Sequence, residues 1–377
     1  MGGIGKTTLA MSIYNKIHGR FEGSSFCLNI RAELQTKGAS GLVALQKRIL
    51  NNLLYQHNDD DVKIDNELHG KGVLSNKLKG INALVVLDDV DEIKHLGALY
   101  EPLQASLGPK SVVIITSRDY KILKSAQPKS IFPMKGLDEK MSKRLFYWHA
   151  FMKPHPPKDL EEVSDKVTEA CKGHPLSLKV VGSHLYHNTD ESFWEESLHY
   201  LLEHEGIVDA LKISYNGLSD NVKEVFLDIC CFLINEREDH ACMVLVAIYG
   251  RGRTYLTALK ERCLITIIAD EDIKEVGRIG MHDLLRDMGR RIVCHRTRRD
   301  RAWDEDTAND IFQNVELRSK LCILSVWSHI PFPEESVDSK FLPELRILVV
   351  NKEYKRTKID QRSFIRTISL GVLIVLR

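Results

Sequence analysis

The chain has 377 residues, of which 43% are hydrophobic and 28% charged, a composition typical of a globular protein with two or three domains. Its 53 basic and 52 acidic residues leave a net charge of +1, so bulk charge gives no support for nucleic-acid binding. The eight cysteines lack metal-ligand spacing, which predicts free, buried thiols in a reducing compartment. No apolar run reaches the ~20 residues of a membrane-spanning helix, and no signal peptide is recognisable, so we expect a cytoplasmic protein, with the nucleus as a second compartment.

The first part of the chain alternates between helical and strand patterns. Helices are predicted from Lys6 to about Gly19 and over residues 41–54, with short strands over 24–30, 81–87 and 111–117. The last two strands are continuous apolar runs, which are typical of strands buried on both faces of a parallel sheet. We therefore predict an α/β domain with a doubly wound parallel sheet over residues 1–137.

The strand signal fades after residue 138. Helical periodicity predicts a helical domain over residues 138–215 and a further domain over 216–300, where a helix, a hairpin and a helix follow one another as in a winged-helix module. We expect residues 301–377 to form a linker and the start of a repeat region, because residues 341–350 resemble one turn of a leucine-rich repeat. For the tail after Asn351 the pattern predicts no structure.

The N-terminal stretch MGGIGKTTLA matches the second half of the phosphate-binding pattern GxxxxGK[ST]. Gly3 and Gly5 would let backbone N–H groups converge on a phosphate, at the positive end of the helix that begins near Lys6. Lys6 would add a charge near the phosphates, and the Thr7 hydroxyl would be offered to Mg²⁺. The alternative is a glycine-rich helix start with an exposed lysine. The first glycine of the pattern would precede Met1.

Two carboxylates follow the predicted strand over residues 81–87, in the stretch ALVVLDDVD. Ligands of parallel sheets bind beyond the carboxyl ends of the strands, and a carboxylate there can hold Mg²⁺. We predict that Asp88 binds the metal and that Asp89 orients or activates a water. The alternative is that these aspartates cap the next helix, which is the role that we expect for Asp91.

Arg118 ends the neighbouring predicted strand in the stretch VVIITSRD. From that edge of the sheet its side chain could reach a γ-phosphate and report whether one is present. A solvated surface arginine is the alternative.

Together these motifs resemble the NB-ARC module of plant nucleotide-binding leucine-rich-repeat immune receptors, over about residues 1–300. The matching stretches occur in the family's order: GGIGKTTLA, LVVLDDVD, VVIITSRD, CKGHPLSLKVVGSHL, ALKISYNGLSDNVKEVFLDICCFL and MHDLLRDMGR. Asp91 and the stretch FLDICCFL resemble the subclass that carries a Toll/interleukin-receptor-like (TIR) domain. The resemblance implies a P-loop NTPase sheet, a helical domain and a winged-helix domain closing over ADP. The TIR domain and the strand that feeds the P-loop are absent, which predicts a truncated receptor or an incomplete gene model.

The resemblance also implies roles for individual residues. Phosphates and metal would be held by five residues of the first motif: Gly3, Gly5, Lys6, Thr7 and Thr8. Asp88 and Asp89 would form the acidic pair, and Arg118 would be the sensor. Pro175 would pack near the base or sugar, and His282 would contact the β-phosphate. The alternative for His282 is a helix-start histidine with its ring in a core.

We therefore predict a slow ADP/ATP switch in immune signalling that uses Mg²⁺ and is reset by hydrolysis. Other immune-receptor or signalling proteins, or further copies of the chain on activation, are the expected partners, whereas nucleic acid is not expected. Three alternatives stay open. They are an ATPase or kinase with a small-molecule substrate, a winged-helix DNA-binding regulator that uses the basic residues 286–301, and an adaptor or decoy that no longer binds nucleotide.

Overall fold

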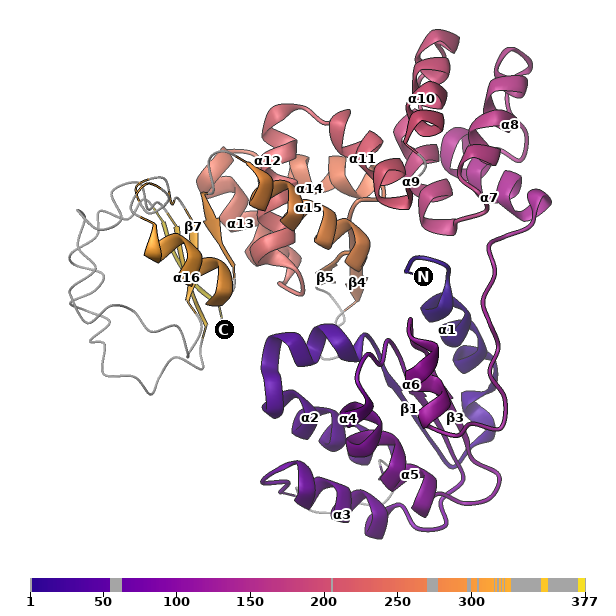
Figure 1. Cartoon of the computed structure of the whole chain (residues 1–377), viewed down its shortest axis with the longest axis vertical. Helices are drawn as coiled ribbons and strands as arrows, with labels where there is room; N and C mark the ends of the chain where they lie inside the picture. Colours follow the sequence, from indigo (N-terminus) through magenta and orange to yellow (C-terminus); the bar gives the residue numbers. More distant parts are fainter. Residues whose placement is uncertain are drawn as a thin grey trace. The chain divides into compact units, whose positions relative to one another are not determined.

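The computed structural model describes residues 2–54, 63–204, 206–269, 277–296, 300–303 and 305–314, and after them residues 316, 319, 321, 323–326, 347–351 and 372–376. The chain divides into two compact units, Met1–Lys135 and Gly136–Arg377. Figure 1 shows their elements in chain order. Among the described residues, no helix is both long and apolar enough to cross a membrane.

The first unit alternates between helices and parallel strands, which confirms the predicted α/β class. Its helices are α1 (Lys6–Ile17), α2 (Ile30–Leu54), α3 (Glu67–Lys77), α4 (Ile93–His95), α5 (Glu101–Ser106) and α6 (Tyr120–Ser125), with a 3₁₀ turn η1 (His18–Arg20) and a π-helical turn η2 (Leu96–Tyr100). Its strands are β1 (Gly23–Cys27), β2 (Ala83–Leu87) and β3 (Val112–Ile115). They form a parallel sheet in the order β1-β2-β3, with Leu87 level with Cys27 and Ile115.

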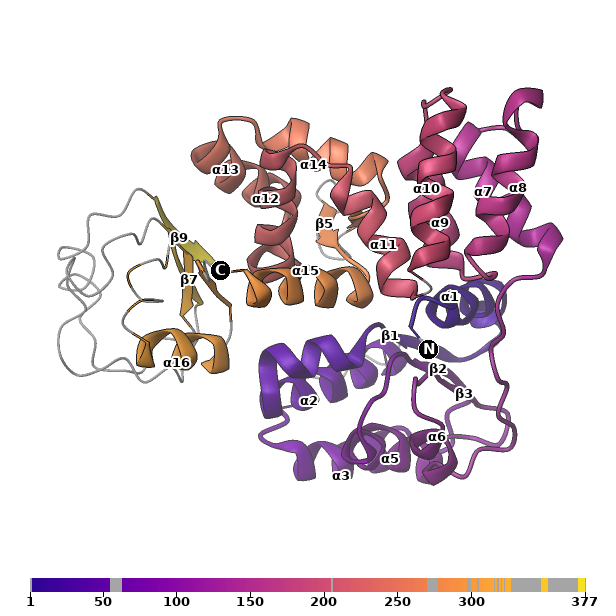
Figure 2. The same ribbon diagram turned by 45° about the horizontal axis from the view of Figure 1, so that its top comes forward.

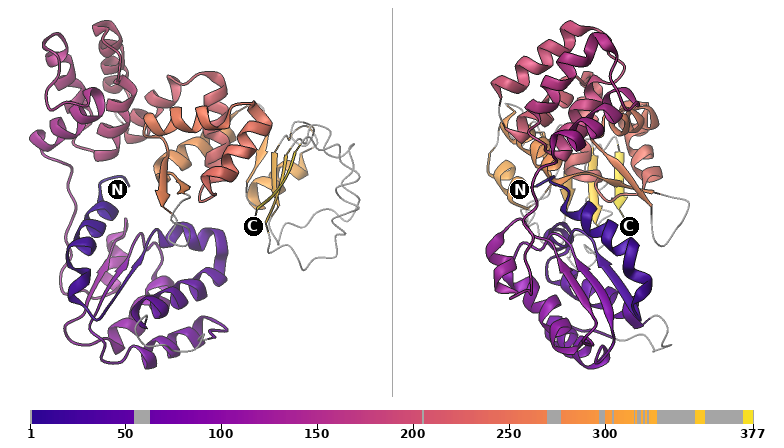
Figure 3. Two further views of the ribbon diagram at one scale, coloured as in Figure 1. Left: turned by 180° about the vertical axis from the view of Figure 1, so that it is seen from behind. Right: turned by 90° about the vertical axis from the view of Figure 1, so that its right-hand side faces the viewer.

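All five residues of β2 are buried, as the continuous apolar run predicts. Ala83, Val85 and Leu87 join the hydrophobic cluster that α2, α3 and α5 also build. Successive side chains of a strand point to opposite faces, so Leu84 and Val86 face the other side of the sheet. There α1 lies against the strands, as Figure 3 shows from behind. The sheet is therefore covered on both faces, and the carboxyl ends of its strands lie at one edge.

The second unit begins with a helical region. It consists of α7 (Glu139–Phe151), the turn η3 (Lys158–Leu160), α8 (Glu161–Ala170), α9 (Pro175–Leu185), α10 (Glu191–Glu203) and α11 (Ile207–Asn216). Its core is centred on Trp194, which is fully buried and stacks on Phe151 at 5.2 Å between ring centroids. The helices predicted over residues 138–215 are observed as α7 to α11.

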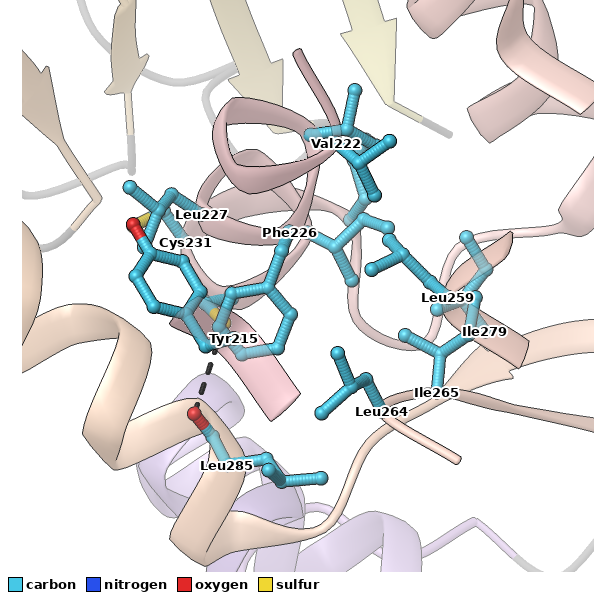
Figure 4. Close-up of a cluster of buried hydrophobic side chains, with 14 of the residues drawn as sticks. Tyr215, Val222, Phe226, Leu227, Cys231, Leu259, Leu264, Ile265, Ile279 and Leu285 are labelled. Atoms are coloured by element: carbon cyan, nitrogen blue, oxygen red, sulfur yellow. Dashed lines mark hydrogen bonds between the residues drawn. The ribbon is translucent and has the colours of Figure 1, made fainter. Parts of the chain in front are cut away.

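A hairpin flanked by helices follows, in the order that a winged-helix module requires. The elements are α12 (Asp220–Asp228), a π-helical turn η4 (Ile229–Leu233), α13 (Glu238–Tyr249), α14 (Gly252–Glu261), β4 (Thr266–Ala269), the antiparallel β5 (Gly277–Gly280) and α15 (Asp283–His295). Figure 2 shows α15 lying across the ends of α11 and α12. Phe226, Leu259 and Ile279 belong to the buried core between these elements, and the Cys230 thiol contacts the carbonyl oxygen of Leu285 (Figure 4).

Beyond α15 the described residues form a four-stranded parallel sheet, β6 (Arg301–Ala302), β7 (Ile323–Val326), β8 (Ile347–Asn351) and β9 (Val372–Leu376), with α16 (Glu305–Gln313) after β6. Strands β7, β8 and β9 begin at residues 323, 347 and 372, at the 20–29-residue spacing of leucine-rich repeats. The sequence pattern indicated only one such turn, at residues 341–350. Of that stretch, residues 341–346 lie outside the described part.

The seven cysteines that the structure describes are free, as predicted, but only four of them are buried and the other three are half-buried. Polar contacts join α9 of the helical region to the two residues that follow α14, Arg262 and Cys263. Ser183 on α9 donates to Cys263 Sγ at 3.1 Å, and its hydroxyl lies 3.4 Å from His149 Nδ1 on α7. Beside them, Arg262 Nη1 lies 3.4 Å from His184 Nδ1. Cys322 lies outside the described residues.

This junction makes the stability of the second unit sensitive to acid. Burial lowers the pKa of His149 to about 4, helped by the charge of Lys179, and burial lowers the pKa of His184 to about 4, helped by Arg262. In the unfolded chain these two histidines take up protons near pH 6.5, whereas in the folded chain they do so only near pH 4. The free energy of unfolding should therefore fall as the pH drops from 6.5 to 4, by on the order of 2 kcal/mol.

Urea unfolding at pH 7 and pH 5 measures this loss. A His149→Gln, His184→Gln double variant should lose less stability between the two pH values than the unmodified chain. His187→Gln is the control, since His187 is exposed on the same helical region. An equal pH dependence in all three proteins would contradict the assignment.

Candidate functional site

The N-terminal loop has the backbone that its glycines allow. Gly3 and Gly5 adopt positive φ angles of 69° and 96°, a conformation that side chains with a Cβ rarely adopt. Gly5 is the N-cap residue of α1, and no side chain caps this helix end. The positive end of the helix dipole at this uncapped start favours an anion. Thr8 lies in the first turn of α1 with an exposed side chain.

Thr7 and Asp88 meet at the carboxyl end of β2. The Thr7 hydroxyl lies 2.9 Å from Oδ1 and 3.0 Å from Oδ2 of Asp88, which is only 1% exposed. Both are hard oxygen ligands of the kind that Mg²⁺ prefers. Their separation matches that of adjacent ligands on an octahedral ion with bonds of ~2.0–2.1 Å. The residues present therefore fit the predicted metal.

Two groups that the sequence analysis missed hold Asp88 in place. Thr116, just beyond β3, donates its hydroxyl to Asp88 Oδ1 at 2.7 Å and accepts the N–H of Asp89 at 2.9 Å. The backbone N–H of Asn29 lies 3.3 Å from Asp88 Oδ2. A polar residue that ends the neighbouring parallel strand was the available signal for Thr116, because such strands end at the same edge.

Asp89 lies between two arginines. Arg118 forms a bidentate contact with it, Nε to Oδ1 at 3.0 Å and Nη2 to Oδ2 at 3.2 Å. Arg31, from the first turn of α2, places Nε 3.7 Å from Oδ2. The predicted sensor and the predicted water-activating carboxylate are thus paired with each other, and Arg31 is an addition that the sequence motifs did not indicate.

Lys6 belongs to the same group of charges. Burial lowers its pKa, the nearby Arg118 guanidinium lowers it further, and Asp89 and Asp88 oppose this effect. The ammonium is therefore partly desolvated beside another cation. A bound anion would offset the repulsion between the two cations, since it would add negative charge beside them.

The expected capping role of Asp91 is wrong. The N-cap of α4 is Glu92, and its side chain accepts no capping hydrogen bond. Asp91 Oδ1 instead lies 3.2 Å from Nδ1 of the buried His95, four residues later. The physical reason is that the helix begins one residue later than the motif suggested, which brings Asp91 onto the same side as His95.

Pro175 and His282 lie in the second unit, each at the start of a helix. Pro175 is the first residue of α9, whose N-cap is His174. His282 is the N-cap of α15, and its Nδ1 accepts the N–H of Leu284 at 3.1 Å. This is the helix-start position of the alternative hypothesis for His282, and it makes Nε2 the protonated nitrogen of the neutral ring.

Four arginines in the described part of the basic stretch over residues 286–301 have partners within the second unit. Arg286 pairs with Asp283 and Asp287, Arg290 donates to the Cys230 carbonyl, Arg296 pairs with Glu224, and Arg301 pairs with Asp228, Glu224 and Asp300. Arg290 also lies over the Trp303 ring. Arginines that hold carboxylates are poorly placed to bind DNA phosphates, so this observation disfavours the DNA-binding alternative.

Comparison with known proteins agrees with this geometry. The NB-ARC domain family matches residues 1–155, and the winged-helix domain of Roq1-like disease resistance proteins matches residues 219–297. TMV resistance protein N from Nicotiana glutinosa is 31% identical over 96% of this chain, and disease resistance protein RUN1 from Vitis rotundifolia is 36% identical over 78% of it. Disease resistance-like protein DSC1 from Arabidopsis thaliana is 34% identical over 78% of the chain.

The alignments cover 31%, 21% and 23% of these three relatives, so the chain spans a third of their length or less. The NB-ARC match contains the loop of Gly3 and Gly5 together with Asp88, Asp89 and Arg118. The chain therefore contains an NB-ARC domain followed by a Roq1-like winged-helix domain, and it is similar over this part to plant disease resistance proteins.

Proposed function

We propose that the chain is the ADP/ATP-binding switch of a plant intracellular immune receptor. The observation that carries this proposal is the contact of the Thr7 hydroxyl with both carboxylate oxygens of Asp88. Thr7 follows Lys6, which in turn follows Gly5 with its left-handed backbone. This contact joins a helix start that suits phosphate to a carboxylate that suits Mg²⁺. The matched NB-ARC family, a nucleotide-binding domain, supports the same ligand.

In this proposal the first unit supplies the diphosphate site. Backbone N–H groups of the α1 start and the Lys6 ammonium would bind the phosphates, and Thr7 and Asp88 would hold Mg²⁺. Bound Mg²⁺ would neutralise part of the phosphate charge. Asp89 is proposed to orient water for slow hydrolysis, and Arg118 to respond to a γ-phosphate. Thr8, Pro175 and His282 remain proposed nucleotide contacts on the strength of the family resemblance.

A switch requires that diphosphate and triphosphate favour different conformations. A ligand shifts such an equilibrium only by its difference in affinity for the two states, and ~5.5 kcal/mol moves it from 1:99 to 99:1. A few charge-assisted contacts to a γ-phosphate are of that size. We place the switch in the cytoplasm or nucleus, with other immune-receptor or signalling proteins, or further copies of the chain, as partners.

Isothermal titration calorimetry of the purified chain tests the proposal. We expect ADP to bind with 1:1 stoichiometry, and ATP binding to weaken when EDTA removes Mg²⁺. A chain that shows its folded circular dichroism spectrum but no heat of binding with either nucleotide would overturn the proposal. Rapid multiple-turnover phosphoryl transfer to a small molecule would favour a metabolic enzyme instead.

A further inference from the structure

We propose that Arg31, Asp89 and Arg118 form an ion-pair relay that sets the preference of the site for nucleoside triphosphate over diphosphate. In this relay Asp89 is paired with Arg118 when no γ-phosphate is bound. When Arg118 leaves Asp89 to bind a γ-phosphate, Arg31 forms the ion pair with Asp89 in its place. Arg31 is then a positioning residue that acts through Asp89. The inference rests on the proposed nucleotide-binding function and adds to it a determinant of nucleotide selectivity.

The first support is that one carboxylate has two guanidinium groups within reach. Arg118 comes from the end of β3 and makes two hydrogen bonds to Asp89, whereas Arg31 comes from α2 and is 3.7 Å from the same carboxylate. The Asp89 side chain is only 12% exposed, and that of Arg31 is 16% exposed. A carboxylate in such surroundings needs a cation beside it in every state of the site.

The backbone of Asp89 fixes the position of that carboxylate. Its φ angle of 56° is left-handed, and its N–H donates to the buried hydroxyl of Thr116, which in turn donates to Asp88. Asp89 is therefore anchored through the residue that also orders the metal-binding carboxylate. When Arg118 moves away, the Asp89 carboxylate stays in place and needs another cation at that same position.

Arg31 is suited to be that partner. An N–O distance of 3.7 Å becomes a hydrogen bond after a movement of less than ~1 Å, within the range of side-chain motion. Arginine stays charged at every physiological pH, so the exchange leaves Asp89 paired throughout.

The relay predicts an effect on selectivity, which a merely structural arginine would not have. In Arg31→Met the apolar stem remains but Asp89 would lose its second partner, so Arg118 would stay bound to Asp89. We expect the Kd for a non-hydrolysable ATP analogue to rise ~10-fold or more, with the Kd for ADP unchanged within ~2-fold. Arg31→Lys should restore most of the lost affinity because it keeps the charge.

The relay also predicts non-additivity. Asp89→Asn removes the charge that holds Arg118, so the triphosphate analogue should bind more tightly relative to ADP. In the Asp89→Asn background, Arg31→Met should have no further effect on the ratio of the two Kd values, because the two residues act through one contact. Arg48→Met is the matched control, since Arg48 pairs with Glu33 on the same helix at 3.1 Å.

Calorimetry with both nucleotides and Mg²⁺, on variants whose folding is verified by circular dichroism, gives the two Kd values. Selective loss of analogue affinity in Arg31→Met, with rescue by lysine, supports the relay. Equal weakening of both nucleotides, or an unchanged Arg31 effect in the Asp89→Asn background, overturns it. If the unmodified chain binds neither nucleotide, the proposed function itself fails. A relay failure is distinguished from that case by normal ADP binding.

Discussion

Replacing Lys6 by alanine is expected to weaken ADP binding by about 10- to 150-fold, the equivalent of ~1.5–3 kcal/mol for hydrogen bonds to a charged group. Lys6 follows the left-handed Gly5 at the start of α1, where backbone N–H groups and the helix dipole already favour an anion. Its ammonium is partly desolvated beside Arg118, as its lowered pKa indicates. A phosphate bound beside Lys6 would offset the repulsion between Lys6 and Arg118. Loss of the ammonium therefore removes a strong contact to the phosphate.

The same argument predicts that Lys6→Ala keeps the stability of the free protein. The substitution removes a cation that burial and Arg118 disfavour, so the thermal midpoint without nucleotide should stay the same or rise slightly. Lys16→Ala is the matched control, because Lys16 is exposed in the last turn of the same helix. Calorimetry with ADP should separate the two variants clearly. Equal ADP affinity of both would place the nucleotide away from Lys6 and would contradict the proposed site.

The first unit shows which features of a fold a sequence pattern can predict. The apolar run bounded by Gly80 and Asp88 is observed as the buried strand β2, because five consecutive apolar side chains can be covered on both sheet faces only in the interior. By contrast, the strand predicted over residues 24–30 ends at Cys27. Asn29 turns the chain with a φ angle of 51°, and α2 begins at Ile30, eleven residues before the predicted helix start. Gly38 and Gly41 obscure the helical pattern there, since glycine is a poor helix former.

The candidate site also contains some features that a sequence pattern can predict and others that it cannot. The sequence assigns Thr7 and Asp88 to one predicted metal site because each belongs to a short motif of known chemistry, and the structure brings them within 2.9 Å of each other. The contacts of Thr116 and Arg31 depend on which strands are neighbours and on how α2 enters the sheet. Such information lies in the packing of distant elements. The polar residue at the end of a neighbouring strand was a signal for Thr116, whereas no local spacing indicates the contact of Arg31.

Packing also determines the partners of the arginines at the end of the winged-helix region. Charge patterns along a sequence indicate a solvated face or an anion site, and both interpretations are open for residues 286–301. The structure pairs two of these arginines, Arg296 and Arg301, with acidic side chains of α12, which lies some 70 residues earlier. Their role in the protein is to attach the chain after α15 to the winged-helix core.

Arg301 is the most buried of these arginines, and its replacement by methionine is expected to lower the free energy of unfolding of the second unit by about 3–5 kcal/mol. Its side chain is 4% exposed, with Nε 2.7 Å from Asp228 Oδ1 and Nη2 2.9 Å from Glu224 Oε2. Burial raises the pKa of Asp228, and the charge of Arg301 opposes that rise. Without Arg301, Asp228 would be a buried carboxylate whose remaining donor is the Tyr249 hydroxyl at 2.5 Å.

Two comparisons identify the unpaired carboxylate as the cause. Adding Asp228→Asn to Arg301→Met should recover part of the lost stability, because an amide costs less to bury than a carboxylate. Arg237→Met, which breaks the more exposed Arg237–Asp239 pair, should cost at most ~1 kcal/mol. Urea unfolding followed by tryptophan fluorescence measures all three, since all four tryptophans of the chain lie in the second unit. An equally small loss of unfolding free energy in Arg301→Met and Arg237→Met would show that the buried ion pair does not stabilise the packing of β6 against α12.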